Sequence, residues 1–275
     1  MLSNEQRKRE PSRWIFSREL RDSNFLEESG DERTKPFVIT PLGTRVKRLL
    51  FVGSITSITK EEEMTKAVIS DTVGSFYVNA GNREYSIRQK EVLDSHDQGD
   101  LVAVMGRVSS FKTDQGNMYF NVFPENIYRS DENARAYWIT MASSSAERKI
   151  MAIREASKLE KPDALSLVKI GYTPEEAECA LRSIKHYPGF DLNQIRDAIS
   201  GLATTAQANQ AVNMAKELVI TIIKSSEDPK GCRYDDIMSG MEAQGVDRQT
   251  VDEALNLLGS EGEIYEVSLK RFRAI

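Results

Sequence analysis

Cysteine, histidine and long apolar runs are all scarce in this chain of 275 residues, which has two cysteines and two histidines. Cys179 and Cys232 lie far apart, which excludes a disulfide framework and a zinc site built on paired cysteines. No apolar run is long enough for a transmembrane helix, which needs about 18 residues. The first ten residues are polar and charged, unlike a signal peptide. We therefore expect an intracellular, cytoplasmic protein with no membrane contact.

The side chains that build common catalytic and cofactor sites are also missing from the sequence. His96 lies in a polar turn and His186 at a helix end, and neither is near a cysteine, so both are expected to be solvated. No glycine-rich loop of the kind that holds phosphates occurs. The sequence thus predicts a protein that is not an enzyme, with no catalytic residues, no metal site and no cofactor.

The formal net charge of −5 argues at first against nucleic acid, but it is unevenly distributed. Residues 36–130 hold 11 basic and 11 acidic side chains, whereas residues 211–275 hold 8 and 12. The excess of negative charge therefore lies mostly in the last segment. Any contact with phosphates should come from elsewhere in the chain.

Short strands separated by turns are predicted in the first half of the chain. They are expected at 46–58, 65–70, 75–80, 101–111 and 117–123, the last ending at Pro124, with a short helix at 89–95. Gly53 permits the bulge or bend that a small barrel needs to close. Five strands with one helix between the third and fourth is the order of an OB-fold, whose loops, here 59–65 and 111–117, bind oligonucleotides. An all-β sandwich is the alternative, and the single helix fits it poorly.

The rest of the chain is predicted to be helical, apart from its two ends. Helices are expected at 146–158, 163–170, 173–187, 191–202, 206–225, 234–244 and 250–261. The last three, followed by strands at 264–267 and 272–275, have the order of a winged helix. Residues 1–35 combine many charges with few apolar residues, as in a flexible arm; a short docked helix between Trp14 and Leu26 is the alternative.

The predicted fold class is therefore α+β, with an OB-fold barrel, a helical region and a C-terminal winged helix. The expected domains are a flexible arm (1–35), the OB-fold (36–130), a post-barrel helix for subunit assembly (131–160), a helical spacer or small bundle (161–205) and the winged helix (206–275). Apolar side chains at helical spacing predict the assembly surface of the post-barrel helix: Ile139, Ala142, Ala146, Ile150 and Ile153.

Several short sequences, in this order along one chain, resemble the replication protein A family. The runs 101–111 and 121–127 resemble the fourth and fifth strands of its middle subunit, and are more similar still to the archaeal replication-protein-A-associated proteins. Pro124, Glu125 and Ile127 match one family element, and Arg135-Ala-Tyr-Trp138 matches the next. The turn at 70–74 and the segment 261–265 are also similar. The resemblance covers residues 36–140 well and 211–275 loosely.

The resemblance implies a single-stranded-DNA-binding subunit or associate of a replication protein A complex, acting in DNA replication and repair at the nucleoid. Its implied partners are single-stranded DNA and sister subunits. Phe111 keeps one stacking position of the family, whereas Ala80-Gly81 replaces the other, for which nearby Tyr85 is the substitute. The alternatives are a structural subunit whose barrel mainly packs against sister subunits, and an RNA-binding OB-fold protein.

The candidate nucleic-acid-binding residues combine cations for phosphates with aromatic rings for bases. They are Phe111, Arg107, Lys112, Tyr85, Arg83, Phe76, Lys66, Arg45, Lys47, Arg88 and Tyr119. Because strand faces alternate, Phe76 and Tyr77 must point to opposite sides, and a core position is the alternative for Phe76.

The second helix of the predicted helix–turn–helix is acidic, with a single arginine, Arg248. Such a helix would repel phosphates, so the sequence predicts that the winged helix docks replication or repair proteins rather than reading DNA.

Overall fold

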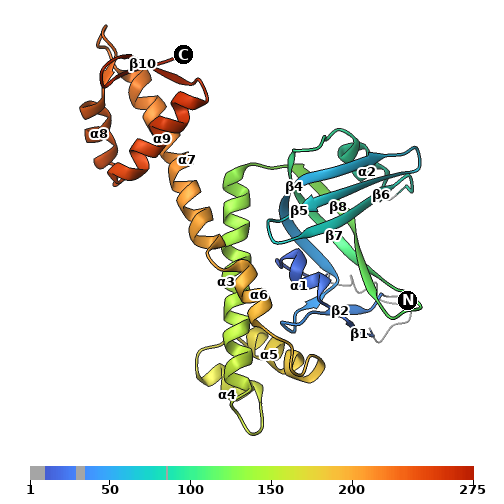
Figure 1. The fold of residues 1–275 in the computed structure, drawn as a ribbon. Coiled ribbons are helices and arrows are strands. Elements are labelled where there is room, and N and C mark those ends of the chain that lie inside the picture. Colours follow the sequence, from blue (N-terminus) through green and yellow to red (C-terminus); the bar gives the residue numbers. More distant parts are fainter. Residues whose placement is uncertain (1–9, 29–34, 85) are drawn as a thin grey trace, which may run out of the picture. The chain divides into compact units, whose positions relative to one another are not determined.

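The computed structural model describes residues 10–28, 35–84 and 86–275, which form two compact units, residues 1–203 and 204–275 (Figure 1). In this part of the chain, none of the helices has the length and apolar character needed to cross a bilayer.

A closed five-stranded barrel forms the centre of the first unit (Figure 1). Its strands are β4 (Arg48–Lys60), β5 (Met64–Ser70), β6 (Ser75–Gly81), β7 (Leu101–Lys112) and β8 (Met118–Arg129). They close in the order β4-β5-β6-β8-β7, with β6 and β8 parallel and the other pairs antiparallel. The predicted OB-type barrel within an α+β chain is thus confirmed.

The last strand does not end at Pro124, as the sequence predicted. Pro124 lies opposite Gly106 and Asn126 opposite Met105, so Glu125 is an extra residue in the ladder. This bulge accommodates a proline that lacks a ladder N–H, and the strand continues for five more residues. In β4 the register shift lies between Ile55 and Ser57 rather than at the predicted Gly53.

Short helices lie at the two ends of the barrel (Figure 1). α2 (Ile87–Asp94) contacts the strands at one end and buries Leu93 completely. α1 (Ser17–Arg21) lies near β6 and β8 at the other end. The barrel thus receives a cap from a segment that precedes it in the chain.

Residues 10–28 are therefore not part of a flexible arm, and this correction has a clear physical reason. Ile15, Phe16 and Leu20 are few, but all three are buried, and Phe16 packs edge-on against Trp138 with the ring centroids 5.1 Å apart. The backbone N–H and the hydroxyl of Ser17 donate to the Asp71 carboxylate at 2.5 and 2.9 Å, and burial raises the pKa of Asp71. The remaining residues of the predicted arm, apart from Lys35, lie outside the described part of the chain.

A second, three-stranded sheet lies next to the barrel, with the order β1-β2-β3. It consists of β1 (Phe25–Glu27), β2 (Phe37–Ile39) and β3 (Arg45–Val46). The turn between β2 and β3, residues 40–44, is buried and holds a polar network. The Glu19 carboxylate accepts hydrogen bonds from the hydroxyls of Thr40 and Thr44, at 2.7 and 2.9 Å, and Lys149 donates to the Thr44 hydroxyl at 3.0 Å.

Four helices complete the first unit, and they correct two predictions. They are α3 (Glu132–Ala156), α4 (Ala164–Lys169), α5 (Pro174–His186) and α6 (Asn193–Ile199). α4, α5 and α6 all contact α3. Residues 161–205 are therefore not a spacer, and the alternative prediction of a small helical bundle fits them better. The five apolar residues predicted for subunit assembly, from Ile139 to Ile153, are buried inside this chain.

The helices are fixed to the barrel and to the small sheet by specific hydrogen bonds. The indole N–H of Trp138 in α3 donates to the Leu50 carbonyl at 2.9 Å. On α5, Arg182 donates to the Gly43 carbonyl at 2.8 Å and Ser183 to the Pro41 carbonyl at 2.6 Å. The 40–44 turn is therefore held from three sides, by α1, α3 and α5.

The second unit has its own apolar core. It contains most of α7 (Leu202–Ser225), β9 (Cys232–Arg233), α8 (Tyr234–Glu242), α9 (Arg248–Ser260), β10 (Ile264–Ser268) and β11 (Arg271–Ala274). The strands form one sheet in the order β10-β11-β9. Val219, Ile237, Met241, Val251 and Leu258 are fully buried between the helices. The two-residue strand β9 was not predicted, since it is too short to show alternation.

Gly43 generates a prediction about stability. Its φ is +73°, and an added Cβ would lie 1.8 Å from the Cys179 carbonyl oxygen. Gly171 also has a positive φ, of +100°, but open space around it. We expect Gly43→Ala to destabilise the first unit by more than about 3 kcal/mol and Gly171→Ala by about 1–2 kcal/mol. Both tryptophans, Trp14 and Trp138, lie in this unit. Urea unfolding followed by tryptophan fluorescence therefore measures the difference, and equal midpoints would contradict the packing described.

Candidate nucleic-acid interface

One outward face of the barrel, formed by β6, β8 and β7, carries a group of exposed aromatic rings. Phe111 and Tyr119 are 62% and 56% exposed, Tyr77 is 56% exposed and Phe123 is 38% exposed. The intervening residues Phe76, Val78, Phe120 and Val122 point into the core. Strand alternation therefore explains why these four rings share the outer face.

The strand register determines which outward residues are neighbours. Phe111 lies directly opposite Tyr119, and Arg107 lies directly opposite Phe123. Val78 pairs with Val122, so Tyr77 on β6 reaches the same face as the β8 rings. We call Phe111, Tyr119, Tyr77 and Phe123 the aromatic face. Rings exposed in this way match what sequence-tolerant binding of single strands requires, because every base has a π-face.

The tip of the β7–β8 hairpin extends past the neighbouring strand. Pairing of β4 with β7 ends at Arg107, whereas pairing of β7 with β8 continues to Lys112. Phe111 and Tyr119 therefore lie on the overhanging part of a two-stranded ribbon. The loop at its end is closed by hydrogen bonds between Thr113 and Asn117.

Cations border the aromatic face, and two of those predicted are already in ion pairs. Arg107 Nε lies 3.2 Å from Glu125, and Lys66 Nζ on β5 lies 3.5 Å from Glu61. Lys112 is exposed where β7 enters the loop. The Lys66–Glu61 pair is exposed on both sides and contributes at most about 1 kcal/mol, whereas the Glu125 carboxylate is only 19% exposed and also pairs with Arg48.

One of the predicted aromatic residues, Phe76, is not on this face. Phe76 is only 2% exposed and stacks on Phe51 with the ring centroids 4.0 Å apart. The prediction that Phe76 stacks on a base is therefore wrong, because the alternation of side chains along β6 points this residue into the core. Tyr77 is the exposed ring on β6. Tyr85 lies outside the described residues.

The remaining predicted cations lie outside β6, β7 and β8. Arg83 and Arg88 belong to the β6–α2 connection and to α2. Neighbouring Asn82 donates to the carbonyls of Glu62 and Glu63 in the acidic β4–β5 loop, which disfavours phosphates there. Arg45 lies on β3, in the small sheet, and Lys47 directly follows that strand.

Phe123 was missed by the sequence reasoning. The sequence feature that could have identified it is the alternation along β8, which places Tyr119 and Phe123 on the same side of the strand. Pro124 obscured that signal, because the strand seemed to end there. The two histidines were also misplaced: His96 is buried with Nδ1 3.0 Å from Asp100, and His186 stacks on Phe25. Both therefore have structural roles in place of solvation.

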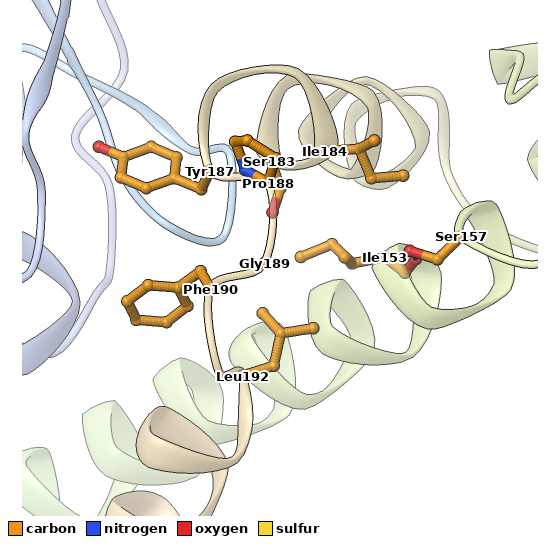
Figure 2. Close-up of a pocket in the computed structure, with 9 residues that line it drawn as sticks. All are labelled: Ile153, Ser157, Ser183, Ile184, Tyr187, Pro188, Gly189, Phe190 and Leu192. Atoms are coloured by element: carbon orange, nitrogen blue, oxygen red, sulfur yellow. Dashed lines mark hydrogen bonds between the residues drawn. The ribbon is translucent and has the colours of Figure 1, made fainter.

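A recess of about 360 Å³ lies between α3, α5 and the loop that follows α5 (Figure 2). Figure 2 shows Ile153, Ile184, Phe190 and Leu192 lining it, with the Tyr187 hydroxyl pointing away. That hydroxyl is bonded to the Ile39 carbonyl. None of the nine lining residues carries a charge. The recess therefore offers packing surface and no group for acid–base chemistry.

Comparisons with known proteins give only partial likenesses. No family model and no curated protein sequence matches this chain. The S. pombe Stn1–Ten1 complex matches with a TM-score of 0.35 and 19% identity, over 46% of this chain and 86% of that chain. A replication protein A heterotrimer bound to single-stranded DNA matches with a TM-score of 0.37 and 14% identity, over 51% and 98%. The mitochondrial single-stranded-DNA-binding protein Rim1 of S. cerevisiae gives 0.26 and 20%, over 30% and 92%.

Proposed function

We propose that this chain binds single-stranded DNA through the aromatic face, as a subunit or associate of a replication protein A complex. The observation that carries the proposal is the direct pairing of exposed Phe111 with exposed Tyr119 on the hairpin tip. Stacking of a base on such a ring contributes about 1–3 kcal/mol, and cations beside it neutralise the phosphates. Binding would therefore be tolerant of sequence and sensitive to salt.

The proposal extends to the middle-subunit type and to the archaeal replication-protein-A-associated proteins that the sequence resembles. The family's stacking position at the end of the third strand is occupied here by Ala80-Gly81. Tyr77, on the same strand and half exposed, is the ring that replaces it. In this role the chain is not an enzyme and works at the nucleoid, in replication and repair.

For the second unit we propose a winged helix that docks replication or repair proteins. α8 and α9 with the β10–β11 hairpin support this, since they have the order of helix–turn–helix and wing. α9 and the residue after it carry Asp252, Glu253 and Glu261 against Arg248. In the hairpin, Tyr265, Val267 and Leu269 are exposed. A partner segment that is basic and apolar fits this combination better than duplex DNA does.

A second function, assembly with sister subunits, is favoured by the outer side of α3. Tyr137, Met141 and Met151 are exposed on it and, at 3.6 residues per turn, fall within about 80° of one another around the helix axis. This surface replaces the buried apolar residues that the sequence predicted for assembly. Methionine-rich helix faces adapt well to partner helices.

The first test removes the rings of the hairpin tip. Phe111→Ala should weaken binding of an oligothymidylate by ~1–3 kcal/mol, and adding Tyr119→Ala should weaken it further, because each ring offers one stacking surface. Fluorescence anisotropy with the full chain measures both. Tyr128→Ala is the matched control, since this exposed ring lies on β8 beyond the bulge. Unchanged affinity in a folded Phe111→Ala variant would reject the site. If the wild-type chain binds an oligouridylate of the same length more tightly than the oligothymidylate, the RNA alternative is favoured.

The second test places a charge on the outer side of α3. Met141→Glu should reduce the mass of the assembled species, because a buried carboxylate at a helix interface is strongly unfavourable. Light scattering on the purified chain and on the complex recovered with its sister subunits measures the mass. Leu165→Glu, at an exposed position on α4, is the control. A monomer in both wild-type samples would count against assembly through α3.

The third test truncates the chain after Thr205. Single-stranded-DNA affinity should stay within about twofold of wild type, since the aromatic face and its cations are retained. A pull-down with the truncated chain should lose at least one replication or repair protein. If residues 204–275 alone bind duplex DNA more tightly than roughly tens of micromolar at physiological salt, the docking proposal is wrong.

A further inference from the structure

The strand β10 is a free edge of the sheet in the second unit. Within the described part of the chain, β10 pairs with β11 alone, because the strand order is β10-β11-β9. Its side chains Tyr265 and Val267 are about half exposed. The strand contains neither proline nor lysine, the residues that often protect an edge from pairing with another chain. Such an edge is a template on which a further strand can add.

The ladder with β11 shows which backbone groups point toward the free edge. The N–H of Ile275 donates to the carbonyl of Glu263 at 3.0 Å, so these two residues form a hydrogen-bonded pair. Bonded and non-bonded pairs alternate along an antiparallel ladder, so Tyr265 also directs its N–H and C=O to β11. Ile264 and Glu266 therefore direct both of their backbone groups toward the free edge.

A second, identical β10 fits this edge in one register better than in the others. Two antiparallel copies form hydrogen bonds where their outward-directed residues face each other. If Glu266 faced its own counterpart, like charges would lie directly opposite, which is unfavourable. If Ile264 faced its own counterpart, Glu266 would face Gly262, which precedes the strand. When Ile264 faces Glu266, both outward-directed residues of each copy are hydrogen-bonded.

This register places Tyr265 opposite Tyr265 of the second copy, in a non-hydrogen-bonded pair. Side chains approach most closely in such pairs, and aromatic pairs across strands are stabilising. The two Glu266 side chains become diagonal neighbours, about 7–8 Å apart, and do not face each other. Each Glu266 carboxylate already accepts the N–H of Lys270 in its own hairpin, at 2.6 Å. The β10 edge is thus complementary to itself in hydrogen bonds, rings and charge.

We propose that β10 pairs with β10 of a second copy of this chain, antiparallel and centred on Tyr265. One short strand buries far less than the roughly 1,200 Å² of a stable interface, so the pairing is weak between free chains. Two chains on one DNA strand are held at a local concentration of about millimolar, where a weak contact forms. This last step rests on the proposed function. Pairing covers Tyr265, so it competes with a partner protein that docks on the same residue.

A cysteine at the centre of the register tests the pairing. In the non-hydrogen-bonded pair the Cα atoms lie about 4.5 Å apart, which a disulfide spans. Full-length Tyr265→Cys with oxidised glutathione should therefore form covalent dimers on a non-reducing gel, with a yield that rises toward about millimolar chain. Cys179 and Cys232 are buried, so wild type should form none. Leu269→Cys is the matched control, since it is 88% exposed in the same hairpin but lies away from the centre, and should give several-fold less dimer.

A proline separates strand pairing from collision of exposed thiols. Tyr265→Cys/Glu266→Pro removes an N–H that points to the free edge and leaves the ladder with β11 intact, so the dimer yield should fall several-fold. Tyr265→Cys/Glu266→Gln keeps that N–H and should retain the yield. Circular dichroism verifies that the variants are folded. Equal yields from Tyr265→Cys and Leu269→Cys, or no effect of the proline, would overturn the pairing.

Oligothymidylates test the step that involves DNA. A strand of about 40 nucleotides has room for two chains and one of about 12 for a single chain, given roughly 4–16 nucleotides per OB-fold. At low chain concentration the long strand alone should raise the dimer yield of Tyr265→Cys. If two chains bind it without more dimer, the link between neighbours on DNA is wrong. If dimers form at high concentration but no oligonucleotide binds, the pairing stands and the proposed function is wrong.

Discussion

The hydroxyl of Thr44 joins a buried carboxylate to a buried ammonium, and the first unit depends on this junction. It donates to Glu19 and accepts from Lys149, so α1, the 40–44 turn and α3 meet at one atom. A buried charge without a partner is costly, which makes each of the three groups necessary to the other two. β3 begins at Arg45, directly after Thr44, so the position of this strand also depends on the Thr44 hydroxyl.

The same junction explains why residues that seemed to form an arm are ordered. A segment rich in charge does not bury enough apolar surface to fold by itself. Here Ile15, Phe16 and Leu20 are buried in the core of the first unit, and the Glu19 carboxylate accepts hydrogen bonds there from Thr40 and Thr44. The composition of a segment describes that segment in isolation. Whether the segment is ordered in the folded protein also depends on the surface against which it packs.

The fold was largely predictable, because alternation and turn residues are local signals. All five barrel strands and the helix between them were found, as was the position of Phe111. What was missed needed non-local information: the bulge at Glu125, the two-residue strand β9 and the side to which Phe76 points. The side of the sheet to which Phe76 points is fixed by the pairing of β6 with its neighbouring strands and by the stacking of Phe76 on Phe51. The apolar spacing along α3 correctly indicated burial, but the partner proved to be this chain's own helices.

The overhang of the β7–β8 hairpin has a mechanical consequence. A ribbon paired on one side only bends and twists more easily than a strand in the middle of a closed sheet. Phe111 and Tyr119 therefore lie on a part of the hairpin that β4 does not support, whereas Arg107 lies where β7 is still paired with β4. For the single-stranded DNA that we propose as the ligand, such flexibility would let the distance between the two rings adjust to purines and pyrimidines at little energetic cost. Tolerance of base identity would then follow from flexibility as well as from chemistry.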